Sequence, residues 1–259
     1  MLAPLLLVLA AGAALAADRV GLYGVTTVTS GTGEKNRDRV LGPALVDVLV
    51  KVSGDAGLVN DPRIAEMATK ANAIPATYAY RDLLNNRPPN HEQGTYDRPQ
   101  YLTVAFDPAA IDAALRSLGR EPWLSRPTVA VFLTVETMKG EIFALDREGT
   151  GMEADMRGSI TAAADRAGIP LDLLVGASLD ALPKDDAAIA GAARANGADV
   201  GLNGTMAWRT EAKGWVVDWT LVSNDKVYRW QDKGVGFDDA FRNAMRQTAR
   251  ILSGHGEAE

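Results

Sequence analysis

The chain has 259 residues, 47% of them hydrophobic, and a formal net charge of -6 at pH 7. It contains no cysteine, which excludes disulfide bonds, thiolate nucleophiles, cysteine-ligated metals and lipid attachment to a cysteine. The negative charge and the lack of basic clusters argue against a nucleic-acid partner.

The first residues have the features of a secretory signal peptide. Residues 2–15 are apolar, and Ala14, Leu15 and Ala16 form an A-x-A cleavage box, so we expect cleavage after Ala16 or Ala17. The apolar run is shorter than the ~20 residues that a membrane-spanning helix needs. No Lys or Arg precedes it, so a retained anchor or a misassigned start are the alternatives. We predict a signal peptide over residues 1–17 and a periplasmic mature protein with no stable membrane anchor.

The first domain is predicted over residues 18–121 and opens with a strand at 20–28. In that strand Val28 belongs to one face and Tyr23 and Val25 to the other. After a polar loop, apolar residues recur at helical spacing. They are Val40, Leu41, Ala44, Leu45, Val48, Leu49 and Val52.

Two helix-breaking residues interrupt the start of this apolar stripe. Proline lacks the backbone donor and restrains the residue before it, so Gly42 and Pro43 predict that the helix either begins at Pro43 or kinks there, and we favour a start at Pro43. Gly54 follows the last apolar position and predicts the end of the helix.

Two further helices are marked by an aspartate followed by a proline. Asp61-Pro62 predicts a short helix to Lys70, and Asp107-Pro108 predicts one that stops at Gly119. Between them, strands near Tyr78 and at 101–106 flank a loop rich in proline and glycine, which indicates a hairpin.

The second domain is predicted over residues 127–254, and its first strand, Val129 to Val135, is apolar on both faces. Such a strand is typical of the centre of a sheet with helices on both sides. A helix from Glu153 to Ala167 follows, with Met152 and Met156 expected to face inward, and then a short strand from Ile169 to Leu171.

The rest of the second domain predicts a helix from Asp185, an antiparallel meander and a final helix led by Asp238. The meander strands are 200–209, 215–222 and 226–230. The predicted fold class is therefore α/β (α+β), with two consecutive mixed-sheet domains whose helices pack on the sheets.

Potential catalytic groups are few. The segment Ser30 to Lys35 is glycine-rich but lacks the Gly-Lys-Ser/Thr triplet of a phosphate-binding loop, so we interpret it as a solvated connection. The two histidines, His91 and His255, lie in a loop and in the tail, where a base for a serine nucleophile would not be held in place. We predict no catalytic, cofactor-binding or metal-binding residues, and no cofactor.

Carboxylate pairs are the residues that favour catalysis, because two carboxyl groups can hydrolyse a glycoside as acid and base. The pairs are Asp185-Asp186 and Asp238-Asp239, and both open predicted helices. There a carboxylate caps free N–H groups and meets the positive end of the helix dipole, so we interpret both pairs as helix caps.

Tryptophan supplies the candidate binding residues. Trp215 and Trp219 share one face of a strand with Val217, and Trp208 and Trp230 lie on the neighbouring strands. Such a face either binds a glycan or a partner protein, or is buried under the last helix. Because Val217 and Leu221 continue the same apolar side, we favour burial.

Several short signatures, taken in order, resemble an exported proteobacterial family known only as domain of unknown function number two thousand and sixty-six. They are Ser53-Gly54-Asp55, the strand 101–106 leading into Asp107, and Trp123 with Arg126-Pro127, and the resemblance extends from about Val20 to the final helix. The stretch Gly149 to Gly151 and the long loop before Tyr101 depart from the family pattern.

The second half also resembles, more distantly, the amino-terminal domain of the Tol periplasmic propeller protein. Activator lipoproteins of peptidoglycan synthases and the curli secretion lipoprotein are similar in the same way. These resemblances imply a non-enzymatic envelope module that docks other proteins. We therefore predict a periplasmic binding or scaffolding module with an envelope protein as its partner. The alternatives are a carboxylate-dependent cell-wall glycan hydrolase and small-ligand binding in a cleft between the domains.

Overall fold

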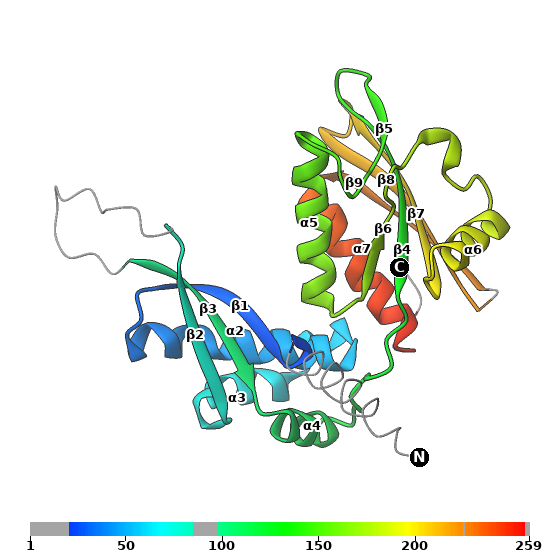
Figure 1. The fold of residues 1–259 in the computed structure, drawn as a ribbon. Coiled ribbons are helices and arrows are strands. Elements are labelled where there is room, and N and C mark those ends of the chain that lie inside the picture. The colour runs from blue at the N-terminus through cyan, green and yellow to red at the C-terminus, as the bar shows by residue number, and fades with distance from the viewer. Residues whose placement is uncertain (1–20, 85–97, 225, 257–259) are drawn as a thin grey trace, which may run out of the picture. The chain divides into compact units, whose positions relative to one another are not determined.

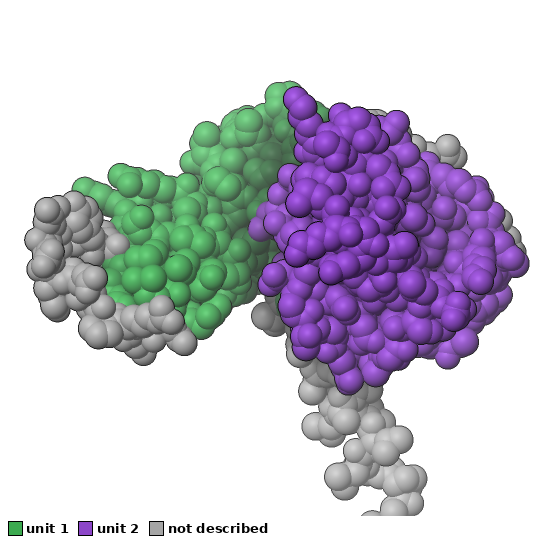
Figure 2. Space-filling model, turned by 90° about the horizontal axis from the view of Figure 1, so that it is seen from above, with its two compact units in different colours: residues 1–122 green, residues 123–259 purple. Residues whose placement is uncertain are grey.

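A computed structural model describes residues 21–84, 98–224 and 226–256 of the chain. The chain divides into two compact units, residues 1–122 (unit 1) and 123–259 (unit 2), which Figure 2 shows in different colours. None of the helices in these described ranges is long and apolar enough to cross a membrane. The predicted signal peptide and His91 lie outside the described residues.

Unit 1 contains a three-stranded antiparallel sheet with the order β1-β3-β2. The strands are β1 (Gly24–Ser30), β2 (Ala76–Asp82) and β3 (Pro99–Phe106). The pairing of β2 with β3 confirms the predicted hairpin.

Helices cover one face of this sheet (Figure 1): α2 (Glu34–Ser53), α3 (Pro62–Thr69) and α4 (Pro108–Ser117). Short 3-10 helices occupy Ala56–Asn60 and Ala71–Ala73. The caps read from the sequence are present, because the Asp61 side chain accepts from the Arg63 N–H and the Asp107 side chain from the Ala110 N–H. The core between sheet and helices includes Leu45, Leu102 and Ile111.

The predicted start of the first long helix was wrong. The helix begins at Glu34 rather than Pro43, and Pro43 lies inside it. Pro43 takes away the donor for the carbonyl of Arg39, which is a solvent-exposed residue, so water can satisfy that carbonyl. Gly42 serves a packing role, because a Cβ at this position would lie 2.9 Å from the backbone oxygen of Ala68 on α3.

The first strand also begins later than predicted. Residues 21–22 are helical, and Tyr23 is buried next to the start of β1, with its hydroxyl donating to Asp112 Oδ1 at 2.6 Å. Val28 is 50% exposed, because its face of the sheet points away from the helices.

Unit 2 is built on a six-stranded mixed sheet with the order β5-β4-β7-β8-β9, in which β6 also pairs with β4. The strands are β4 (Val129–Glu136), β5 (Ile142–Ala144), β6 (Leu171–Leu173), β7 (Val200–Arg209), β8 (Gly214–Ser223) and β9 (Lys226–Val235). β4 is parallel to β6 and β7, and the remaining pairs are antiparallel. The predicted meander is present, and β9 runs beyond its predicted end.

Helices cover both faces of this sheet, as Figure 1 shows. The helices α5 (Met152–Ala167) and α7 (Phe237–Leu252) lie on one face, and α6 (Asp186–Ala195) lies on the other. On the first face the core includes Leu133 of β4 and Phe241 of α7, and on the second it includes Phe132 of β4 and Ile189 of α6. β4 is thus buried on both sides, as its apolar sequence predicts.

Two details of unit 2 differ from the sequence prediction. Met152 is 48% exposed rather than inward-facing, because it is the first residue of α5 and precedes the stripe of Met156, Ile160 and Ala163 that reaches the core. The short strand after this helix is shifted to Leu171–Leu173, because Ile169 forms part of the helix end, where its N–H donates to Ala164. The α/β fold class with a C-terminal helix after the strands is confirmed.

Candidate functional site

The tryptophan face named from the sequence is not an open binding surface. Trp215 is 6% exposed, Trp219 1% and Trp230 8%, and all three belong to the core that β8 forms with α7. Trp208 is half-buried and packs edge-on against Trp215, with ring centroids 5.7 Å apart. The alternation along β8 directs the Trp215 and Trp219 rings under α7, so these side chains form part of the core.

The polar group of Trp219 is also used within the fold. Its Nε1 donates to Asp232 Oδ2 at 3.1 Å, and Asn243 of α7 donates to the other oxygen of that carboxylate at 2.9 Å. Asp232 therefore connects β8, β9 and α7 through one carboxylate.

The carboxylate pairs form structural contacts. Asp185 caps α6 by accepting from the Ala188 N–H at 2.8 Å, and Asp186 pairs with Arg229 at 2.6 Å. The second pair does not supply the N-cap of α7, which is Gly236, but Asp238 and Asp239 lie in the first turn, at the positive end of the helix dipole as interpreted. There Asp238 accepts from Ser159 and Asp239 pairs with Arg242.

The glycine-rich connection and the tail histidine have local roles too. Gly31 adopts a φ of 80°, and its N–H donates to Arg98 O at 2.7 Å, which extends the pairing of β1 with β3 by one residue. His255 lies 2.9 Å from the Ser253 hydroxyl just after α7. That hydroxyl also lies 3.3 Å from Arg250 O, so Ser253 and His255 take part in the hydrogen bonding at the end of α7.

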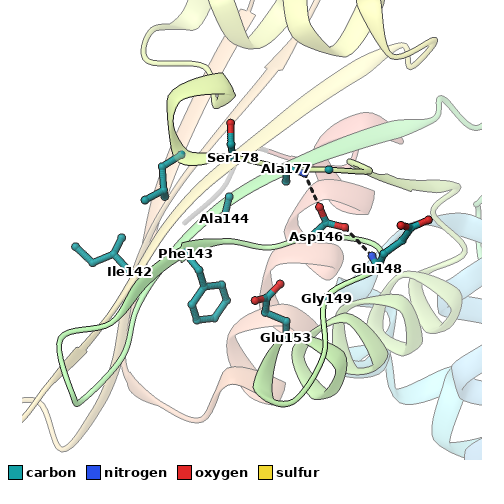
Figure 3. A pocket seen from close by; sticks show the side chains of 11 residues that line it. Ile142, Phe143, Ala144, Asp146, Glu148, Gly149, Glu153, Ala177 and Ser178 are labelled. Atoms are coloured by element: carbon teal, nitrogen blue, oxygen red, sulfur yellow. Dashed lines mark hydrogen bonds between the residues drawn. The ribbon is translucent and has the colours of Figure 1, made fainter.

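The site that sequence analysis missed is a pocket of about 470 Å³ in unit 2 (Figure 3). Its wall consists of β5 and the turn that follows it, residues 142–149, together with Glu153 at the start of α5 and the loop 176–179 after β6. It is lined by apolar side chains and by three carboxylates, Asp146, Glu148 and Glu153.

Asp146 fixes the shape of this pocket. Its carboxylate accepts from the backbone N–H of Glu148 at 2.6 Å and from that of Ala177, so it joins the turn after β5 to the loop after β6 (Figure 3). These bonds lower the pKa of Asp146 from its ordinary value of 3.8. The hydrogen bond from the Glu148 N–H lowers the pKa most, and desolvation raises it. The N–H groups of Ala177 and Gly176 and the charge of Arg157 lower the pKa further. Its oxygens are therefore already engaged by the backbone.

The other two carboxylates are not neutralised by nearby cations. Within the described part of the chain, neither Glu148 nor Glu153 forms an ion pair. Two arginines flank them. Arg147 pairs with Asp172, and Arg157 donates to the backbone oxygen of Gly149 at 2.7 Å. The pocket thus presents two carboxylates, and the arginines close to them in sequence, Arg147 and Arg157, have other partners.

Gly149 is needed for this arrangement. A Cβ on Gly149 would lie 2.7 Å from the Cβ of Glu153, so a larger residue would displace the start of α5. The glycine-rich stretch, noted in the sequence only as a departure from a family pattern, was the signal that could have indicated the pocket.

Two exposed apolar side chains, Ile142 and Leu179, line the pocket, and three more lie in the chain segments next to its lining residues. Of the nine large hydrophobic residues that are exposed in the described ranges, five lie in the segments that form or flank it. We call these five the apolar rim: Met138 (71% exposed), Ile142 (56%), Met152 (48%), Val175 (58%) and Leu179 (42%). Apolar side chains gathered on a surface, rather than scattered singly, are typical of an interaction site.

Among the described residues, no group of three or more histidine, cysteine, aspartate or glutamate side chains is arranged to hold a metal ion. The arrangement of the pocket is suited to binding, with two carboxylates within an apolar surround.

Unit 1 is the part of the chain that matches a known protein family model. No curated protein matches the chain. The resemblances to the family numbered two thousand and sixty-six and to the Tol propeller protein therefore stay predictions. Residues 16–124, a stretch that includes the described part of unit 1, match the model of a family described as "Domain of unknown function (DUF8605)", so this part of the chain is similar to an uncharacterised domain.

Proposed function

We propose that this chain is an exported, non-enzymatic module of the bacterial cell envelope that binds a partner protein through the apolar rim of unit 2. The observation that carries the proposal is that exposed Ile142 and Leu179 line one pocket, with exposed Met138, Met152 and Val175 in the adjoining chain segments. Burying apolar surface releases about 25 cal/mol per Å², so a partner that covers the rim gains free energy from each of these side chains.

The proposed compartment rests on the N-terminal sequence. The apolar run of residues 2–15, the cleavage box ending at Ala16 and the absence of cysteine are typical of a secreted protein without a lipid anchor. Cell fractionation with an antibody against the mature chain tests it. We expect a soluble periplasmic product that lacks its first 16 or 17 residues. An intact N-terminus in the cytosol would refute the proposed export.

Partner binding is tested with two matched variants. Ile142 in the rim and Val59 in unit 1 are both 56% exposed, so Ile142→Ser and Val59→Ser remove similar exposed apolar groups. The tagged chain is incubated with envelope extract after mild crosslinking, and recovered proteins are quantified by mass spectrometry. We expect a specific partner whose recovery falls severalfold with Ile142→Ser and stays unchanged with Val59→Ser. Equal recovery with both variants would refute the rim as the binding surface.

A second candidate function, hydrolysis of cell-wall glycan, is favoured by the presence of Glu148 and Glu153 in one pocket. Against it, Glu148 is exposed to solvent, whereas acid catalysis by a carboxyl group depends on an apolar enclosure. Incubation of the purified chain with peptidoglycan separates the two functions. Release of soluble fragments that is lost in Glu153→Gln would establish the hydrolase, and we expect no release.

A further inference from the structure

The outer edge of β5 offers unpaired backbone groups to the pocket. The Leu145 N–H donates to Leu133 O at 2.8 Å, and the Thr137 N–H donates to Glu141 O at 2.8 Å. In an antiparallel pair, residues with hydrogen bonds to the partner alternate with residues whose N–H and C=O point the other way. Phe143 therefore bonds to β4, and the N–H and C=O groups of Ile142 and Ala144 point outward.

β5 is an edge strand, so these groups have no strand beside them. Among the strands in the described ranges it pairs only with β4, while β6 occupies the neighbouring stretch of β4. Ile142 and Ala144 both line the pocket. The pocket thus runs along an open strand edge, which is the arrangement that accepts an extended peptide as an additional strand.

The two sides of β5 differ in chemistry. Phe143 packs on the side of α5, where Glu153 lies in the first turn of the helix and also lines the pocket. On the opposite side, Ala144 belongs to the core beneath α6, and Ile142 shares its face. Leu179, in the loop that leads toward α6, also lines the pocket. An added strand would meet carboxylates with one set of side chains and apolar groups with the other.

We propose that unit 2 binds an extended segment of its partner by strand addition to β5, and that this segment alternates basic with apolar side chains. The inference rests on the proposed function and names the binding mode and the class of partner. The basic side chains reach Glu148 and Glu153, which form no ion pairs among the described residues. The apolar side chains cover Ile142 and Leu179. A second copy of this chain is a poor occupant, because each copy has a net charge of -6.

Amide hydrogen exchange on the full mature chain tests strand addition directly. The probe is a synthetic eight-residue peptide in which valine alternates with lysine. A valine–glutamate peptide of the same length and a valine–lysine peptide with N-methylated backbone are the controls. With the valine–lysine peptide we expect exchange at the Ile142 and Ala144 amides to slow by about tenfold or more as the new bonds form. The Phe143 amide, already bonded to β4, serves as the internal control and does not change.

Two variants separate the contribution of the backbone to peptide binding from the contribution of charge. Ile142→Pro removes an outward N–H without removing a bond to β4, so unit 2 keeps its fold and loses peptide binding. Glu153→Gln weakens binding of the valine–lysine peptide by about two- to fivefold, as expected for an exposed ion pair. Glu66→Gln in unit 1 removes one carboxylate charge elsewhere and leaves binding unchanged. Tryptophan fluorescence of each variant reports whether unit 2 is folded.

The outcomes distinguish this inference from the proposed function. Main-chain bonds supply most of the contact, so any alternating peptide of the right charge suffices as a probe. If the Ile142 and Ala144 amides exchange at the same rate with millimolar valine–lysine peptide, strand addition is refuted. The proposed function still stands in that case if Ile142→Ser reduces recovery of the partner and Val59→Ser does not. Equal protection by the lysine and glutamate peptides would refute the basic partner while retaining the strand edge.

Discussion

Replacement of Gly204 by alanine tests how tightly the core of unit 2 is packed. Gly204 on β7 faces Trp219 on β8. A Cβ at position 204 would lie 2.5 Å from Cζ3 of Trp219 and 2.7 Å from Cδ1 of Leu133. Carbon atoms pack at about 3.5–4.0 Å, so the new methyl group falls about 1 Å short of a normal contact on two sides.

Neither neighbour can move aside easily. Trp219 is 1% exposed and Leu133 is 0% exposed. The Trp219 ring stacks on Trp230 with centroids 6.5 Å apart and meets Phe241 edge-on at 6.4 Å. An extra methyl group in a well-packed core costs about 1–3 kcal/mol. Because the indole is held on several sides, we expect Gly204→Ala to lower the free energy of unfolding of unit 2 by about 2–3 kcal/mol.

Tryptophan fluorescence during urea unfolding measures this loss in unit 2 alone, because all five tryptophans of the chain lie at or beyond residue 123. Gly158 on α5 provides a control with the same substitution. It is exposed, with nothing within 4 Å of an added Cβ. Gly158→Ala should raise the free energy of unfolding by about 0.5–1 kcal/mol, since alanine is the better helix former.

A double variant identifies the clash as the cause. Trp219→Phe shortens the ring that the new methyl group meets, so the two substitutions together should cost about 1 kcal/mol less than the sum of their separate effects. An unchanged or higher urea midpoint for Gly204→Ala would refute the packing argument. Strict additivity of the two changes would show that the methyl group and the indole do not collide.

Three further predictions concern charged groups. The pKa of Asp146 is lowered, so the stability it contributes is present above its ordinary pKa of 3.8 and is lost as the pH falls through the folded value. Asp146→Asn should therefore be less stable than wild type at pH 7, with a difference that shrinks below pH 3.8 in urea titrations; a difference independent of pH contradicts this. The pKa of Asp61 is lowered to about 2, first by the side-chain hydrogen bond from Arg63 and then by the Arg63 N–H, so Arg63→Gln should raise it toward 3.8 in an NMR titration. A value that stays at about 2 would argue against the side-chain bond as the main cause. Arg120→Met leaves the Asp55 side chain, which is 8% exposed, without its ion-pair partner at 2.8 Å. Unit 1 should lose about 1–3 kcal/mol, measured by circular dichroism, and an unchanged transition would show that Arg120 does not compensate the carboxylate.

Features set by neighbouring residues could be predicted without the structure. The Asp107-Pro108 cap and the stop after Leu118 lie within α4 and next to it. The apolar run of β4 indicated a strand covered on both sides, and the alternation of Trp215, Val217 and Trp219 indicated burial of that face. In these cases the pattern that stabilises the element is local, so it is visible in the order of the residues.

The start of α2 could not be predicted in this way. Gly42 and Pro43 are unfavourable inside a helix, and local reasoning therefore placed the start of the helix at Pro43. The structure keeps them because buried residues on both sides, from Leu41 to Val52, pack against the sheet. A glycine at position 42 also lets the backbone of α3 approach closely. Packing free energy outweighs local propensity at this point.

The pocket could not be predicted from the sequence, because only the tertiary structure brings its walls together. Its walls come from β5 and from the loop after β6, two segments separated by the whole of α5. They meet because β5 and β6 share one edge of β4, a pairing that three-residue strands do not reveal in their sequences. Helix caps and apolar faces are consequences of local geometry and could be read residue by residue. The open strand edge and its carboxylates form only where distant segments pair. Strand pairing uses backbone hydrogen bonds, and the order of the side chains says little about which strands will pair.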